Sequence, residues 1–520
     1  MISSEKRQPL LGAIAGCLLA CLSSATQAAP ADPMVTLAAG KVRGSKLAAP
    51  DVYVFKGIHY GQSTAGAARF KAPQAVKAWQ DIKDATKFGD VCPQGGDVGR
   101  RTTTAGELLP QSEDCLVLNV WTPVLADNKR RPVLVWFHGR GFYAGAGSEP
   151  LYDGARLAKR GDVVVVTVNH RLNVFGHLYL AGVAGDEFAA SGNAGVQDME
   201  LALRWVRDNI RAFGGEPGNV TVFGESGGGA KVATLLGLPS ARGLFRRGII
   251  QSGPRLAGMP AATALENTKQ IMSKLQVGTV AEVQALPMEK LLAAVTVTGR
   301  TEPDLGPVTD GRYLPADMFD PVAAASAKDI PIIIGSNRDE YSLYARENPN
   351  FGKMTDAELR ADLAPAFGPD LEPLIAAYRE SRPDATPWDL MIAIRSNRFH
   401  IGTIRLAEVQ SKVAPVYLYS FDFEPTERLK AAHGSEIPFV FSNATAAPGA
   451  RPEASAVETA MSEAWIAFAR TGSPNHSAMP AWPTYNDKTR SVMVFGKQTR
   501  VVEDLRSAER KVWDGRELVR

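Results

Sequence analysis

Short apolar runs recur along the chain and predict strands that are buried on both faces. They occupy residues 133–137, 163–168, 220–223, 248–251, 330–334 and 416–420. Strands that are apolar on both faces are typical of a parallel sheet covered by helices on each side. The pattern therefore predicts a mostly parallel central sheet.

Helical patterns alternate with these runs. Over residues 197–213, apolar side chains recur near helical spacing, and Gly214 and Gly215 end the pattern. An alternation of strands and helices indicates an α/β fold with helices on both faces of the sheet. We therefore expect a doubly wound α/β architecture.

Two further segments are mostly helical in pattern, near residues 257–328 and 355–412. We interpret them as helical lid insertions over one end of the sheet. No linker separates either segment from the rest of the chain, so residues 29–520 are predicted to form a single domain.

The first 28 residues, 1–28, resemble a cleavable export signal. Lys6 and Arg7 precede an apolar stretch over residues 10–22, and small residues follow it. The stretch is short for a bilayer span, although a membrane anchor is an alternative. Residues 14–17 also resemble a lipobox, so lipoprotein anchoring is a third interpretation. We expect a periplasmic or secreted protein whose mature chain has no integral membrane span.

Composition adds few constraints. The chain has 520 residues, a formal charge of +3 and an ordinary share of apolar and charged residues for a globular protein. No basic block stands out, so neither nucleic acid nor an anionic membrane surface is predicted as a partner. No zinc-type spacing or nucleotide-binding motif occurs, so we expect no metal and no cofactor. The oligomeric state is not predicted.

Cys92 and Cys115 are the only cysteines outside the predicted signal. An even pair in an exported chain is compatible with a disulfide, and two unpaired buried thiols are the alternative. In the chain-entropy model, closing this loop contributes about 3 kcal/mol to stability.

The main chemical signal is a G-x-S-x-G motif with Ser226 at its centre. A Val-rich strand precedes it and a plausible helix over residues 230–236 follows it. This strand–turn–helix context is that of a nucleophile elbow. We therefore predict Ser226 as a nucleophile, rather than as an incidental serine in a Gly-rich loop.

A serine nucleophile needs a base, and His433 is the best placed candidate. In folds with this elbow the chain order is serine, acid, histidine. Of the histidines downstream, His400 lies in a helical-looking run and His476 in a Pro/Asn/Ser loop. His433 precedes Gly434 in a loop after a predicted strand, where such a base is expected.

The acid and the oxyanion donors follow from similar patterns. Asp339 and Glu340 both come just after an apolar strand, and spacing alone does not separate them. Backbone N–H groups that bind the oxyanion are expected from Gly227, which follows the nucleophile, and from the Gly-rich loop over residues 138–142.

These motifs, taken in order, resemble the type-B carboxylesterase and cholinesterase family over most of the chain. Besides the elbow, the matching segments are residues 55–60, 68–70, 112–116, 118–123, 169–172, 175–176, 192–198, 213–215, 472–475 and 482–483, with Trp465, Phe468 and Ala469. The resemblance implies the α/β-hydrolase fold for the catalytic domain. It also implies hydrolysis of small-molecule carboxylic esters through an acyl-enzyme.

The resemblance also assigns residues. The acid would be Glu340 and the base His433, which matches the family's H-G-x-E-I-P-F motif. Cys92 and Cys115 would form the family's first disulfide. The oxyanion donors would be the backbone N–H groups of Arg140, Gly141 and Gly227. A lipase-like hydrolase of longer-chain lipid esters is an alternative function. A non-catalytic binding protein is another, which the presence of all three catalytic residue types disfavours.

Three positions depart from the family pattern. Arg140 stands where the oxyanion loop has glycine, and its side chain either faces solvent, pairs with a carboxylate or recognises an anionic acyl group. Gly227 stands where alanine is usual, which we expect to be mild. Tyr341 stands where glycine usually follows the acid, so different local packing is expected there.

Overall fold

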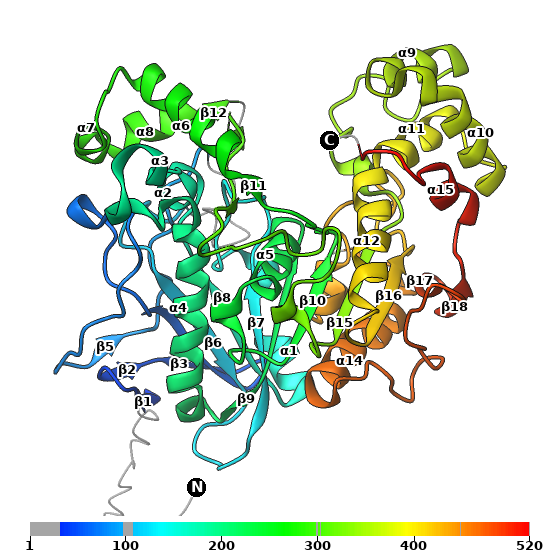
Figure 1. Cartoon of the computed structure of the whole chain (residues 1–520). Coiled ribbons are helices and arrows are strands. Elements are labelled where there is room, and N and C mark those ends of the chain that lie inside the picture. The colour runs from blue at the N-terminus through cyan, green and yellow to red at the C-terminus, as the bar shows by residue number, and fades with distance from the viewer. Residues whose placement is uncertain (1–31, 97–107, 298–299, 302, 448, 519–520) are drawn as a thin grey trace, which may run out of the picture. The chain divides into compact units, whose positions relative to one another are not determined.

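The central element of the fold is an 11-stranded sheet, in the order β18-β17-β16-β15-β10-β9-β7-β8-β6-β4-β3 (Figure 1). Seven neighbouring strands run parallel: β8 (Val164–Val168), β7 (Arg131–Phe137), β9 (Gly215–Glu225), β10 (Arg247–Gln251), β15 (Ile332–Asn337), β16 (Val416–Phe421) and β17 (Ser491–Phe495). The outer strands pair antiparallel: β3 (Ser45–Leu47), β4 (Val52–His59), β6 (Val117–Thr122) and β18 (Arg500–Glu503). The predicted mostly parallel sheet is confirmed.

This computed structural model describes residues 32–96, 108–297, 300–301, 303–447 and 449–518. Residues 33–520 group into one compact unit. The predicted export signal, residues 1–28, lies outside the described residues. Within the described ranges, no helix combines the length and the apolar character needed to cross a bilayer.

Both faces of the sheet are covered, which explains why its strands are apolar throughout. Along β7, Val133 and Val135 pack into one core cluster while Leu134 and Trp136 pack into the other. The first cluster includes side chains of α4 (Ala194–Asn209), α5 (Gly227–Leu236) and α12 (Asn397–Gln410). The second includes side chains of α1 (Ala155–Gly161) and α14 (Ala454–Thr471). Because successive side chains of a strand point to opposite faces, a strand buried on both faces needs apolar side chains at successive positions.

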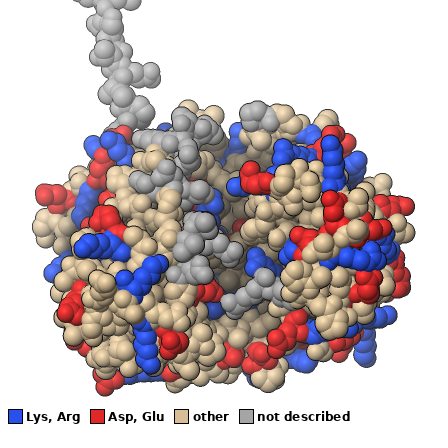
Figure 2. Space-filling model, turned by 90° about the horizontal axis from the view of Figure 1, so that it is seen from above, with Lys and Arg blue, Asp and Glu red and all other residues tan. Residues whose placement is uncertain are grey.

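Two groups of helices extend beyond the sheet (Figure 1). The first comprises α6 (Ala261–Leu275), α7 (Val280–Ala285) and α8 (Met288–Val295), whose apolar side chains form a cluster of their own with α2 (Asn173–His177). The second comprises α9 (Asp356–Phe367), α10 (Leu371–Ser381) and α11 (Pro387–Arg395), with a separate cluster. Figure 2 shows the molecule from above, and the surface seen there is hollowed at its centre. The next helix, α12, packs Leu406 and Ala407 into the core of the sheet, so the segment 355–412 divides between the second group and the sheet layer.

A small sheet lies at the start of the described chain and comprises β1 (Met34–Thr36), β2 (Lys41–Arg43) and β5 (Lys83–Asp84). Cys92 and Cys115 are joined by a disulfide, and both are buried.

Candidate active site

Ser226 occupies a strained turn between β9 and α5. Its backbone dihedrals are φ 58° and ψ −121°, a region that residues with a side chain rarely adopt. The Ser226 N–H donates to the carbonyl oxygen of Gln251 at 2.8 Å, which ties the turn to the end of β10. The side chain is half-buried and stands at the N-terminus of α5. The hydroxyl is thus presented at the carboxyl edge of the parallel sheet, as in a nucleophile elbow.

The glycines that flank the serine are required by close backbone packing. A Cβ atom at Gly228 would lie 2.0 Å from the carbonyl oxygen of Phe137, and one at Gly224 would lie 2.5 Å from the carbonyl carbon of Gly228. No side chain fits at either position without moving the backbone of β7 or of the elbow. The spacing of the motif therefore follows from the crowding of its turn.

Two loops at the same edge bring an acid to the candidate base. Glu340 begins a 3-10 turn (Glu340–Leu343) after β15, and His433 lies in the loop that follows β16. The Nδ1 atom of His433 is 2.5 Å from Oε2 of Glu340, and Oε1 of Glu340 accepts a hydrogen bond from the Asn337 N–H at 2.8 Å. Glu340 is completely buried. This geometry holds the imidazole ring in one orientation.

The carboxylate of Asp339, which precedes Glu340 in the sequence, makes different contacts. Asp339 pairs with Arg338 at 2.7 Å and accepts a hydrogen bond from the Ala431 N–H at 3.1 Å. The other two candidate histidines bond to backbone carbonyls. His400 bonds through Nε2 to Asn337 at 2.8 Å, and His476 through Nε2 to Ala460 at 3.0 Å. Of the residues that the sequence left open, the structure brings Glu340 and His433 together.

The loop after β7 approaches the elbow closely. Arg140 and Gly141 have left-handed backbone conformations, with φ 62° and 57°. A Cβ atom at Gly227 would lie 2.3 Å from the backbone nitrogen of Gly141. The expectation that Gly227 is a mild departure is therefore wrong, because an alanine here would force the loop away from the elbow. The close approach brings the backbone N–H groups expected to bind an oxyanion into one region.

Side chains in and near this loop, and Tyr341 after the candidate acid, make the following contacts. The Arg140 guanidinium is 3.1 Å from Oε2 of Glu149, so its charge is paired. Beneath the loop, the buried Lys231 of α5 donates a hydrogen bond from Nζ to the carbonyl oxygen of His138 at 2.7 Å. Tyr341 packs against the apolar cluster of α9, α10 and α11, and its N–H donates to the Ser396 hydroxyl at 3.0 Å. The third departure from the family pattern thus joins the site to the second helical group.

Two buried carboxylates near His433 were not identified from the sequence. Oε1 of Glu225, the last residue of β9, lies 3.2 Å from Nε2 of His433. Glu436 accepts hydrogen bonds from Nε2 of Gln251 at 3.1 Å and Nδ2 of Asn337 at 2.6 Å. A signal was available for each, because Glu225 ends an apolar strand inside the G-x-S-x-G motif and Glu436 lies in the motif of His433.

The carboxylates and the imidazole shift one another's ionisation. Burial raises the pKa of Glu225 to about 8, although the nearby His433 opposes the shift. Burial lowers the pKa of His433, but the carboxylates of Glu225 and Glu340 outweigh it and raise the pKa to about 9. Burial and the nearby Glu340 also raise the pKa of Glu436. Glu225 and His433 therefore each favour the charged form of the other.

Two aromatic rings flank the imidazole of His433. The Phe399 ring, from α12, lies 4.8 Å from it between ring centroids, and the Tyr344 ring lies 5.5 Å away. Phe399 is buried, whereas 45% of Tyr344 is exposed. No local pattern in the sequence identifies these residues, because their contact with His433 depends on how α12 packs.

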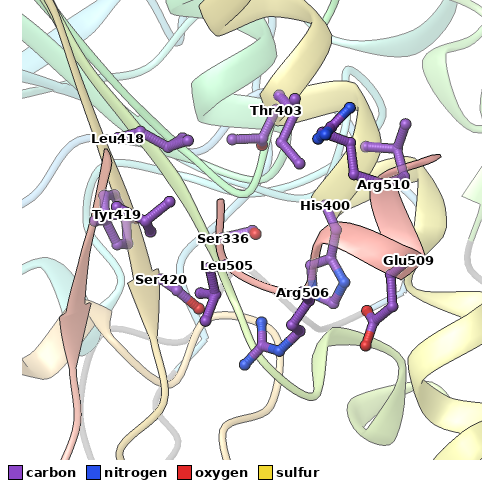
Figure 3. A pocket seen from close by; sticks show the side chains of 13 residues that line it. Ser336, His400, Thr403, Leu418, Tyr419, Ser420, Leu505, Arg506, Glu509 and Arg510 are labelled. Carbon is purple, nitrogen blue, oxygen red and sulfur yellow. The ribbon is translucent and has the colours of Figure 1, made fainter. Parts of the chain in front are cut away.

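A pocket lined in part by His400 is drawn in Figure 3, and its lining includes neither Ser226 nor His433. It lies between the ends of β15 and β16, α12 and α15 (Ser507–Val512), and contains about 450 Å³ of space between atoms, including open solvent. The charged residues on its wall form ion pairs: Arg506 with Asp422 at 2.8 Å, Glu509 with Arg382 at 2.7 Å, and Arg510 with Asp504 at 2.9 Å. These pairs connect α15 to the rest of the molecule.

Comparison with known proteins identifies the family of the chain. The model of the carboxylesterase family matches residues 31–513. The para-nitrobenzyl esterase of Bacillus subtilis is 37% identical over 92% of this chain and 98% of its own length. The phenmedipham hydrolase of Pseudarthrobacter oxydans is 35% identical over 87% of this chain and 94% of its own length.

A solved structure gives the same result. The carboxylesterase of Geobacillus stearothermophilus superposes with a TM-score of 0.81 at 40% sequence identity, covering 92% of this chain and 99% of the other. Such agreement over nearly the full length of both chains confirms the α/β-hydrolase fold. The chain therefore belongs to the carboxylesterase family.

Proposed function

We propose that this carboxylesterase hydrolyses small-molecule carboxylic esters through an acyl-enzyme on Ser226, with His433 as the base and Glu340 as its orienting acid. The contact between Nδ1 of His433 and Oε2 of Glu340, at the sheet edge that also bears the strained Ser226, carries this proposal. Relatives named para-nitrobenzyl esterase and phenmedipham hydrolase support small molecules as the substrate class.

In the first half-reaction His433 accepts the proton of the Ser226 hydroxyl as its oxygen attacks the ester carbonyl. The negative charge that develops on the carbonyl oxygen is stabilised by the backbone N–H groups of Arg140, Gly141 and Gly227. His433 then gives the proton to the leaving alcohol. In the second half-reaction a water molecule repeats the sequence and releases the acid. Glu340 stabilises the imidazolium in both steps.

The first test of the proposed activity uses the purified wild-type protein. We expect hydrolysis of p-nitrophenyl butyrate that saturates with substrate, and complete inactivation by one equivalent of a fluorophosphonate. A well-folded protein that shows neither property would contradict the proposal and favour a non-catalytic role.

Glu340→Gln is expected to lower kcat by about 10⁴-fold, because the neutral amide neither stabilises the imidazolium nor fixes its tautomer. Asp339→Asn is the matched control, since Asp339 pairs with Arg338 instead of His433. We expect it to change kcat by less than about tenfold. Steady-state kinetics on p-nitrophenyl butyrate measures both variants. The opposite ranking would assign the role of the acid to Asp339.

Glu225→Gln is expected to move the acidic limb of the kcat/KM profile to lower pH by about one unit. The Glu225 carboxylate favours the protonated imidazole and raises the pKa of His433. Removing that charge lowers the pKa, so the base is free at a lower pH. A profile from pH 5 to 10 measures the shift, because kcat/KM reports ionisation in the free enzyme. Glu427→Gln, at a side chain that is 94% exposed, is the control. An unchanged limb, or a shift to higher pH, would contradict the assignment.

We also propose that the protein is exported, to the periplasm or the medium, after removal of residues 1–28. The disulfide between Cys92 and Cys115 is compatible with an oxidising compartment and supports this location. N-terminal sequencing of the mature protein distinguishes cleavage after Ala28 from lipoprotein processing before Cys17.

A further inference from the structure

Arg398 places a guanidinium close to the candidate base. It is the second residue of α12, the helix that begins near the second helical group (Figure 1). Its guanidinium carbon lies 4.7 Å from the centroid of the Phe399 ring and 5.8 Å from that of Tyr344. These are the two rings that flank His433. A positive charge is therefore held one aromatic ring away from the imidazole.

Four other cations around the site each have a carboxylate partner, and the buried Lys231 donates a hydrogen bond to the carbonyl oxygen of His138. The pairs are Arg140 with Glu149 at 3.1 Å, Arg338 with Asp339 at 2.7 Å, Arg395 with Asp362 at 2.6 Å, and Lys430 with Asp389 at 2.6 Å. The guanidinium of Arg398 makes no ion pair or hydrogen bond with any residue that the structure describes, and its contacts are the two rings. Arg140, for which the sequence suggested anion recognition, is paired with Glu149, whereas Arg398 has no such partner among the described residues.

A half-buried arginine stacked on aromatic rings is well suited to bind an anion. Stacking restricts the side chain before any ligand arrives, so less conformational entropy is lost on binding. The planar guanidinium keeps its N–H groups available at its edge, where a carboxylate accepts two parallel hydrogen bonds.

We propose that Arg398 forms a subsite for a carboxylate carried by the alcohol portion of the ester substrate. The inference rests on the proposed function, because the placement follows from the role of His433. The imidazole delivers its proton to the leaving alcohol, so the rings beside it and the cation stacked on them lie on the alcohol side of the scissile bond. The oxyanion loop, in contrast, bears a cation that Glu149 already neutralises.

The test compares two esters of matched shape. 3-Carboxyphenyl butyrate carries the anion on its alcohol portion, and 3-carbamoylphenyl butyrate is the neutral analogue. A second pair, p-nitrophenyl hemisuccinate and p-nitrophenyl butyrate, places the anion on the acyl portion instead. The variants are Arg398→Gln, Arg398→Lys and, as a control for net charge, Arg207→Gln on α4, where the arginine is 48% exposed and pairs with Asp208.

Arg398→Gln should lower kcat/KM for 3-carboxyphenyl butyrate about tenfold, mainly through KM, since the contact is made equally in the ground and transition states. The neutral analogue should change less than about twofold. Arg398→Lys should retain part of the preference, because it keeps the charge without the planar fork. Arg207→Gln should leave the ratio of the two esters unchanged.

Three outcomes would overturn the inference. They are an equal loss on both esters, which would mean that Arg398 only supports the rings, an unchanged kcat/KM for both esters, and an effect confined to the hemisuccinate. Failure of the proposed function is distinguishable, since the wild-type protein would then hydrolyse neither neutral ester.

Discussion

Replacing Ser226 with alanine is expected to lower kcat for p-nitrophenyl butyrate by about 10⁶-fold, leaving only catalysis by binding and the oxyanion donors. In the proposed mechanism the hydroxyl oxygen of Ser226, on the strained turn between β9 and α5, is the atom that forms the acyl-enzyme. Stopped assays at high enzyme concentration measure the residual rate. Thermal unfolding of the variant checks that the elbow still folds.

Covalent labelling gives an independent measurement. A fluorophosphonate should add one adduct per wild-type chain, and peptide mapping should place it on Ser226. The Ser226→Ala variant should remain unlabelled. Labelling that persists in this variant would show that another residue is the nucleophile.

Replacing His433 with alanine is expected to cost nearly as much, about 10⁶-fold in kcat, because the serine hydroxyl then has no base and the leaving alcohol no acid. Since both residues act in the same step, the Ser226→Ala/His433→Ala double variant should be no slower than either single variant. The kcat values of the three variants on one ester test this directly.

His476→Ala is the control for loss of an imidazole, because His476 bonds to the carbonyl of Ala460 on α14. Its kcat should stay within about threefold of the wild-type value, as for a substitution outside the catalytic unit. If the losses of the two single variants multiplied in the double variant, His433 would act independently of Ser226, and the proposed proton transfer between them would be wrong.

The sequence by itself determined the sheet and the turn that presents the candidate nucleophile. Strands such as residues 133–137 and 416–420 are apolar on both faces. This pattern is visible in the local sequence and indicates burial between two helical layers. The elbow is equally local, since the strand, the serine and the helix are consecutive and the turn admits only glycine at Gly224 and Gly228. The order of the motifs also indicated the family that the comparisons confirmed.

Only the tertiary structure decided which side chains meet at the edge of the sheet. Asp339 and Glu340 are adjacent in the sequence, and the turn after β15 directs one to Arg338 and the other to His433. Sequence motifs likewise contain Glu225 without showing that its carboxylate reaches the imidazole.

The same holds for the positions that depart from the family pattern. The close approach of Gly227 to Gly141, the pairing of Arg140 with Glu149 and the stacking of Arg398 on Phe399 each depend on how separate segments pack. The pattern of strands and helices depends on residues that are neighbours along the chain. The charge and shape of a site depend on neighbours in space, and a change of one helix position or one turn alters them without changing the pattern of apolar and polar residues.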